Sequence, residues 1–138
     1  MNEFIVFDKT EVGKKPRLVK FDAFSIKENW IYLELDGIEV LHAHLDDVEI
    51  CYFIRKTDIE GEKIYAESSI VEFDFGTITG NHKSKVIGVF KYSTYSLRYN
   101  IHLYDKRERV FSYNSNLMQN LKVIGSLQEK PELLGDAE

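Results

Sequence analysis

Two histidines are the residues whose type and spacing most directly suggest chemistry. His42 and His44 are two positions apart in an alternating, apolar segment. Side chains two apart on a β-strand point to the same face, so both imidazoles could bind one metal ion. A third ligand could come from Asp46, Asp47 or His102, but no local motif joins these residues. Surface or inter-strand polar pairing is the interpretation that the pattern favours, and we expect no cofactor.

An acidic run follows the histidines and is a second place to look for catalysis. Asp46, Asp47 and Glu49 could act as acid and base only if one carboxyl group were partly buried and its pKa raised. A turn between two strands explains the run better. Neither a nucleophile elbow nor a Ser-His-Asp or Cys-His signature accompanies it. The sequence therefore disfavours an enzymatic function.

A third candidate is a stretch in which basic and aromatic residues alternate. About half of its aromatic side chains should enter the core, and the rest would lie beside positive charge. Such a patch suits an acidic protein surface or single-stranded nucleic acid, and the net charge of −5 makes nucleic acid the less favoured partner. The binding residues that we predict here are Lys91, Tyr95, Arg98, Tyr99, Arg107 and Arg109.

The charge distribution and the cysteine content limit the possible partners and the cellular compartment. Residues 27–75 carry thirteen acidic and four basic side chains, whereas residues 76–113 carry two acidic and seven basic ones. Cys51 is the only cysteine and reads as a small core residue, so an intrachain disulfide is excluded. The N-terminus has the pattern of neither a signal peptide nor a membrane span. We expect a cytoplasmic protein.

The elements that would position these residues are mostly short strands. Alternating hydrophobicity between turn residues predicts an antiparallel meander. Its clearest element is a hairpin whose turn is Asp36-Gly37, because this pair favours a type I′ turn. The predicted strands are 4–7, 18–26, 30–35, 38–45, 48–55, 64–75, 86–92, 97–104 and 109–113.

Near the C-terminus the apolar spacing changes. Leu117, Leu121, Ile124 and Leu127 recur every three or four residues, which predicts an amphipathic helix over 115–129 that Pro131 ends. We therefore expect a mainly β single domain over 1–130, built as a barrel or as two orthogonal sheets with one C-terminal helix. It would comprise extra strands in 1–28 and a seven-strand meander in 29–113, and 131–138 would form a flexible tail.

The order of these elements resembles the pleckstrin-homology-like fold, especially its bacterial variants. The resemblance covers about residues 29–130, and the segments that carry it are 30–40, 45–50 and 109–113. It implies two orthogonal sheets whose open end is plugged by the helix. It also implies a binding role rather than catalysis, with phosphoinositides, peptides or proteins as ligands. An up-and-down barrel is the structural alternative.

One departure from that family bears on the ligand. Headgroup-binding members use basic residues on a long loop between their first two core strands, and the acidic Asp36-Gly37 turn stands at that place. Phosphoinositide binding at a membrane is therefore disfavoured. The leading hypothesis is a non-enzymatic protein-binding or scaffold module that also self-associates. The alternative is a small barrel that binds a small molecule or metal, or acts as a hydrolase, through His42 and His44.

Overall fold

The structure is a computed structural model that describes residues 3–76, 83–104, 109–113 and 118–135. It is mainly β, and every strand pairing in the described part is antiparallel. Contacts divide the chain into two compact units, Met1–Tyr52 and Phe53–Glu138, which we call the N-terminal and the C-terminal unit. The strand β6 (Val48–Thr57) belongs to both. The predicted fold class, mainly β with one C-terminal helix, is confirmed.

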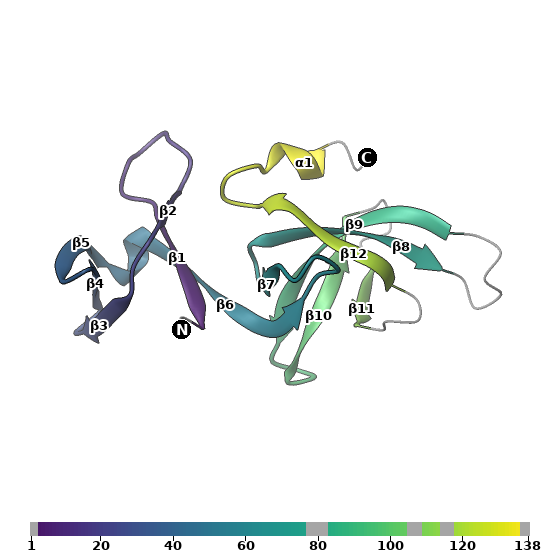
Figure 1. The fold of residues 1–138 in the computed structure, drawn as a ribbon, viewed down its shortest axis with the longest axis horizontal. Coiled ribbons are helices and arrows are strands. Elements are labelled where there is room, and N and C mark those ends of the chain that lie inside the picture. The colour runs from purple at the N-terminus through teal and green to yellow at the C-terminus, as the bar shows by residue number, and fades with distance from the viewer. Residues whose placement is uncertain (1–2, 77–82, 105–108, 114–117, 136–138) are drawn as a thin grey trace. The chain divides into compact units, whose positions relative to one another are not determined.

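The N-terminal unit contains two sheets. In one, β1 lies between β2 and the first half of β6, and in the other β4 lies between β3 and β5. A short 3-10 turn at Leu45–Asp47 leads from β5 to β6. The strands are β1 (Phe4–Asp8), β2 (Arg17–Val19), β3 (Ala23–Lys27), β4 (Trp30–Leu35) and β5 (Ile38–His44), labelled in Figure 1.

The core of this unit joins the inner faces of both sheets. Val6 and Val19 are paired across β1 and β2, and Ile31 and Leu33 of β4 are fully buried. The residues of β4 alternate, so that Trp30, Tyr32 and Glu34 point away from the core. The other buried members of this cluster are Phe21, Leu41, Ala43 and Val48.

The Asp36-Gly37 hairpin is confirmed. Asp36 has φ 54° and Gly37 φ 78°, and a type I′ turn needs positive φ at both positions. The β3–β4 connection is a second turn of this kind, since Glu28 has φ 51° and Asn29 φ 70°. The sequence did not predict it, because glutamate is not a usual residue at a left-handed position. It divides the predicted strand 18–26 from β4, and a break at 20–22 separates β2 from β3.

The C-terminal unit is built on a five-stranded sheet with the order β11-β10-β9-β8-β12. The second half of β6 pairs with β7 beside it. Its buried core includes Phe73, Phe90 and Ile101. The elements are β7 (Lys63–Tyr65), β8 (Ser69–Gly76), β9 (Lys83–Ser93), β10 (Arg98–Leu103), β11 (Val110–Ser112), β12 (Met118–Ser126) and α1 (Glu132–Gly135), shown in Figure 1.

The predicted helix over 115–129 is wrong, because β12 occupies most of this range and pairs with β8. Two register shifts interrupt that pairing, between Gln119 and Lys122 and between Val123 and Gly125. A β-bulge adds one residue to its strand, so the buried Met118 and Leu121 are three positions apart rather than two. This spacing imitates the period of a helix. Leu117 lies outside the described residues.

The helix that is present follows Pro131 instead of preceding it. Proline fits the first turn of a helix, since its missing N–H has no intrahelical partner there. The α1 segment begins at Glu132 and lies beside the end of β12 (Figure 1). A Cβ built on Gly125 would lie 2.9 Å from Cδ1 of Leu133, so this glycine makes room for the segment that returns over β12. The part of the tail at 132–135 is therefore helical.

The pleckstrin-homology-like resemblance stays a prediction. It relied on a long terminal helix, and the residues assigned to that helix form β12. Closure of the strands into a barrel and the single-domain boundaries also stay predictions. The division into two units is a feature that the sequence did not indicate. His42 and His44 belong to the N-terminal unit, whereas the basic and aromatic stretch belongs to the C-terminal unit.

Candidate functional site

The basic and aromatic residues of β9 and β10 lie on two opposite faces of their sheet. The register pairs Lys91 with Asn100 and Tyr92 with Tyr99. Since neighbouring residues of a strand point to opposite faces, Lys91 and Arg98 share one face, and Tyr99 lies on the face that carries the core. The predicted binding residues therefore do not form one surface.

Two members of the predicted site take part in internal packing. The guanidinium carbon of Arg109 lies 5.5 Å from the ring centroid of Phe75 and 5.7 Å from that of Phe111, as in a cation–π contact. Tyr99 packs edge-on against Tyr92 with their ring centroids 5.2 Å apart. These contacts give Arg109 and Tyr99 a structural role in the C-terminal unit.

The remaining members are dispersed. Tyr95 lies in the turn between β9 and β10 and is 99% exposed. Arg98 donates to the hydroxyl of Ser112 at 3.4 Å, and Arg107 lies outside the described residues.

Partial burial, and then the charge of Lys91, lower the pKa of His102, although nearby Glu67 acts in the opposite direction. His102 is therefore neutral at physiological pH.

His42 and His44 do share a face, as predicted, and they pack against aromatic rings. His44 accepts the backbone N–H of Asp46 on its Nδ1 atom at 3.1 Å, which leaves Nε2 as its only free ring nitrogen for a metal. Across the described ranges, no three His, Cys, Asp or Glu side chains gather closely enough to hold a metal ion. A metal site at this pair stays a prediction.

The outward face of β3, β4 and β5 carries a cluster of rings that we call the aromatic face. The His42 ring stacks on Tyr32 at 4.2 Å with an interplanar angle of 22°. The Trp30 ring lies 5.0 Å from His42 and 5.4 Å from His44. The sequence indicated the two histidines but not their aromatic neighbours. The register supplies that information, since it pairs Trp30 with His44 and Tyr32 with His42.

The edge strand β3 is the second surface that sequence reasoning missed. All five of its residues are exposed, and Phe24 and Ile26 are each 50% exposed. The register pairs them with the buried Leu33 and Ile31, so they extend the apolar inner face of the sheet beyond the covered core. Alternating hydrophobicity in 18–26 showed a strand but could not show that one edge of it is uncovered.

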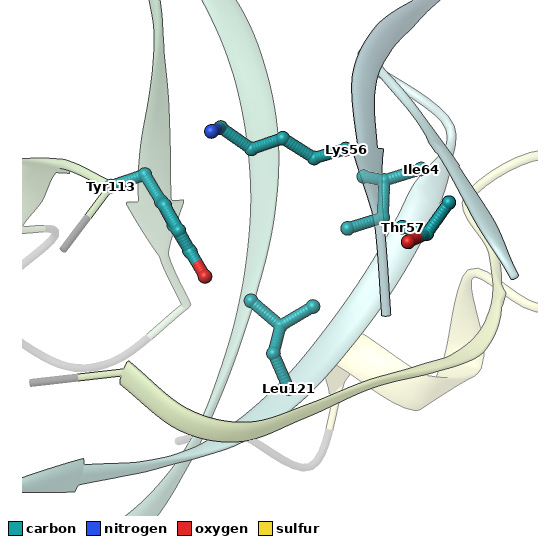
Figure 2. A pocket seen from close by; sticks show the side chains of 5 residues that line it. All are labelled: Lys56, Thr57, Ile64, Tyr113 and Leu121. Carbon is teal, nitrogen blue, oxygen red and sulfur yellow. The ribbon is translucent and has the colours of Figure 1, made fainter. Parts of the chain in front are cut away.

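The C-terminal unit has a small hollow of about 160 Å³ between β6, β7, β12 and Tyr113, the residue that follows β11. Figure 2 shows Tyr113 on one side of it and Ile64 with Thr57 on the other. The ammonium group of Lys56 lies 4.6 Å from the centroid of the Tyr113 ring, so this cation already has an aromatic partner. Leu121 completes the lining.

A second hollow of about 290 Å³ shares Thr57, Tyr113 and Leu121 with the first. Both fall below the usual size of a site that encloses a small molecule, about 300–1,000 Å³. Tyr113 and Met118 line the second hollow, and the residues between them lie outside the described part. His42 and His44 line neither hollow. The alternative role in small-molecule binding or hydrolysis through this pair stays a prediction.

Asp58 borders the second hollow, but its carboxylate is used within the fold. It is 7% exposed and accepts the backbone N–H groups of Glu60, Glu62 and Val123 at 2.8–2.9 Å. Burial alone would raise the pKa of Asp58, but these three donors and the charge of Lys122 outweigh it and lower the pKa. An ionised carboxylate with every oxygen occupied is a structural group rather than a general base.

Comparisons with known proteins identify no relative. No protein-family model, curated protein or solved structure matches the chain. Within the described residues, no helix has the length and apolar character that crossing a bilayer requires. The two exposed surfaces of the N-terminal unit that could bind a partner are the β3 edge and the aromatic face.

Proposed function

We propose that the chain is a protein-interaction module that docks an extended strand on the β3 edge, and that a second copy of the chain is its partner. The observation that supports this most is the exposure of Phe24 and Ile26 on an edge strand. Backbone N–H and C=O groups on an open edge can pair with a strand of another chain. The proposal refines the expected non-enzymatic protein-binding role.

The β3 edge lacks the usual protection against pairing. Natural edge strands carry charges, prolines or bulges that prevent association. In β3 the only charge is Lys27, at the last position, and there is no proline. Its pairing with β4 runs through all five residues without a register shift, so the strand is regular. Within the described part of the chain, β4 is the only strand beside it.

The β3 sequence is complementary to itself. Antiparallel pairing about a two-fold axis at Ser25 places Phe24 opposite Ile26 of the second copy, twice. An aromatic residue opposite a β-branched one is a favourable cross-strand pair. The same register places Ala23 opposite Lys27, so the lysines lie at the two ends and do not face each other. The interface is isologous and closes as a dimer.

Neighbouring rings enlarge the apolar surface beside β3. Phe4 contacts Phe24 edge-on with ring centroids 4.9 Å apart, and it lies 6.0 Å from Tyr52. Tyr52 is exposed, whereas Phe21 is buried beside Phe24 at a centroid distance of 6.4 Å. This inner-face cluster would be covered by the second copy together with the strand edge, and aromatic residues are the usual anchors of such interfaces.

Sedimentation equilibrium of the purified chain tests the proposal. The interface is small, so we expect a weak dimer with a Kd on the order of 100 µM or below. Ile26→Lys should give a monomer throughout, because it places two additional charges beside the apolar pairs. The matched control is Ile38→Lys, which changes a 69% exposed isoleucine on β5, the opposite edge of the same sheet, and should leave the dimer intact.

Two results would refute the proposed dimer through β3. A wild-type chain that remains monomeric up to millimolar concentration has no self-docking edge. A dimer that Ile38→Lys dissociates and Ile26→Lys does not would place the interface on the wrong edge. Far-UV circular dichroism of both variants verifies that each retains its strands.

A further inference from the structure

The aromatic face is unusual for the solvent side of a sheet. An antiparallel sheet with one covered face usually presents polar residues on the other. Here Trp30 is 41% exposed, and its ring lies beside those of His42 and His44, while Tyr32 stacks on His42. Tyr32 itself is only partly exposed. An exposed tryptophan within a cluster of rings is typical of binding sites rather than of inert surfaces.

Two carboxylates lie beside the rings on the same face. Glu34 and Glu39 are direct partners across β4 and β5, and Glu34 follows Trp30 and Tyr32 in the outward alternation. Like charges directly opposite each other destabilise a sheet. No ion pair to either side chain occurs within the described residues. A cation placed between them would relieve their repulsion.

The wider charge distribution also favours a cation. Residues 1–52 contain eleven acidic and six basic side chains, so the N-terminal unit carries the whole net charge of −5. Residues 53–138 are balanced, with twelve of each. On the aromatic face, the register places one basic residue, Lys27, in the row of Trp30 and His44. On this face, the pair Tyr32–His42 separates that row from Glu34 and Glu39.

We infer that the aromatic face binds an arginine side chain of a basic polypeptide segment. A guanidinium group can stack on an aromatic ring while it donates two parallel hydrogen bonds to a carboxylate, and Tyr32 lies in the row next to Glu34 and Glu39. A lysine ammonium offers neither the planar stacking nor the fork of donors. A neutral sugar would use the rings but leave Glu34 and Glu39 facing each other. The residues of the site lie on the opposite face of the sheet from Phe24 and Ile26.

The only tryptophan of the chain makes this site directly observable, because Trp30 can be excited selectively over the tyrosines. The purified chain is titrated with amidated hexa-arginine at moderate salt. We expect saturable quenching of Trp30. Hexa-lysine has the same side-chain charge, and we expect it to bind about tenfold more weakly, since it cannot stack or donate in a bidentate manner.

Charge-matched variants locate the binding. The double variant Glu34→Gln and Glu39→Gln should weaken hexa-arginine binding about tenfold. Its control is Glu60→Gln with Glu62→Gln, which removes the same charge from an exposed loop of the C-terminal unit and should bind within about twofold of wild type. All four positions are exposed, so folding is preserved, and circular dichroism verifies it.

Three outcomes would overturn the inference. Equal affinity for hexa-lysine and hexa-arginine would mean that net charge alone attracts the peptide. Equal loss of binding in both double variants would show that the aromatic face is not the site. Quenching by cellohexaose without any response to hexa-arginine would identify the face as a sugar platform instead.

Discussion

Gly88 shows how one residue without a side chain decides the packing of two strands. A Cβ built on this β9 residue would lie 2.9 Å from Cγ1 of Ile101 and 3.0 Å from the carbonyl oxygen of His102, both on β10. The backbone oxygen cannot move without disturbing the β9–β10 ladder. Glycine is therefore required at this position by close approach rather than by an unusual φ.

Gly88→Ala is expected to destabilise the C-terminal unit by about 2 kcal/mol, because overpacking forces the two strands apart. Gly76→Ala is the matched control. It lies at the end of the neighbouring β8, no described atom lies within 4 Å of the Cβ it would gain, and its effect should stay within about 0.5 kcal/mol. Urea denaturation followed by circular dichroism measures both. Equal stability of the two variants would contradict the role of Gly88.

At the scale of elements, β12 shows what sequence patterns cannot distinguish. The hairpin of β4 and β5 could be predicted almost to the residue, because Asp36-Gly37 carries its own turn preference. The spacing of the apolar residues in β12 is instead set by two bulges in its pairing with β8. No local sequence signal predicts these bulges. Apolar residues three and four positions apart therefore predict a helix where the chain forms a bulged strand.

Local sequence patterns also predict only part of the candidate surfaces. His42 and His44 could be recognised because they are adjacent in one strand. Trp30 and Tyr32 could not be joined to them before the register was known. The exposure of Phe24 also depends on which sheet edge remains open, which is a property of the assembled unit.

The loop between β6 and β7 is tied to β12 by Asp58, and this link gives a prediction for pH. Its pKa is lower in the folded chain than in the unfolded chain, where a value of about 3.9 applies. Protonation therefore favours unfolding. The contribution of Asp58 is complete above about pH 4 and is lost as the pH falls through the folded pKa.

Asp58→Asn should lower the free energy of unfolding by about 2 kcal/mol at pH 7, because its amide cannot accept all three N–H groups. The difference from wild type should narrow below about pH 4, where the aspartate itself becomes protonated. Asp46→Asn, at a largely exposed side chain, is the control and should have little effect. Urea titrations at several pH values measure this, and a difference that is independent of pH would contradict the assignment.

At the scale of the whole molecule, the two units have different characters. The C-terminal unit has a balanced charge, and most of its predicted binding residues are dispersed or used in packing. The N-terminal unit holds the net negative charge, an apolar open edge and an exposed ring cluster. We therefore propose that the N-terminal unit makes the interactions, through β3 with a second copy and through the aromatic face with an arginine side chain.

Disulfide crosslinking at the proposed two-fold axis is the most direct test of the central claim. In the expected register Ser25 faces Ser25 of the second copy, so Ser25→Cys should form a covalent dimer under mild oxidation. Cys51 is 1% exposed and does not compete. Ile38→Cys, on the opposite edge, should react much more slowly. Rapid formation of the Ser25→Cys dimer, seen as a doubled mass without reductant, is the predicted result; a rate no faster than that of Ile38→Cys would contradict docking at β3.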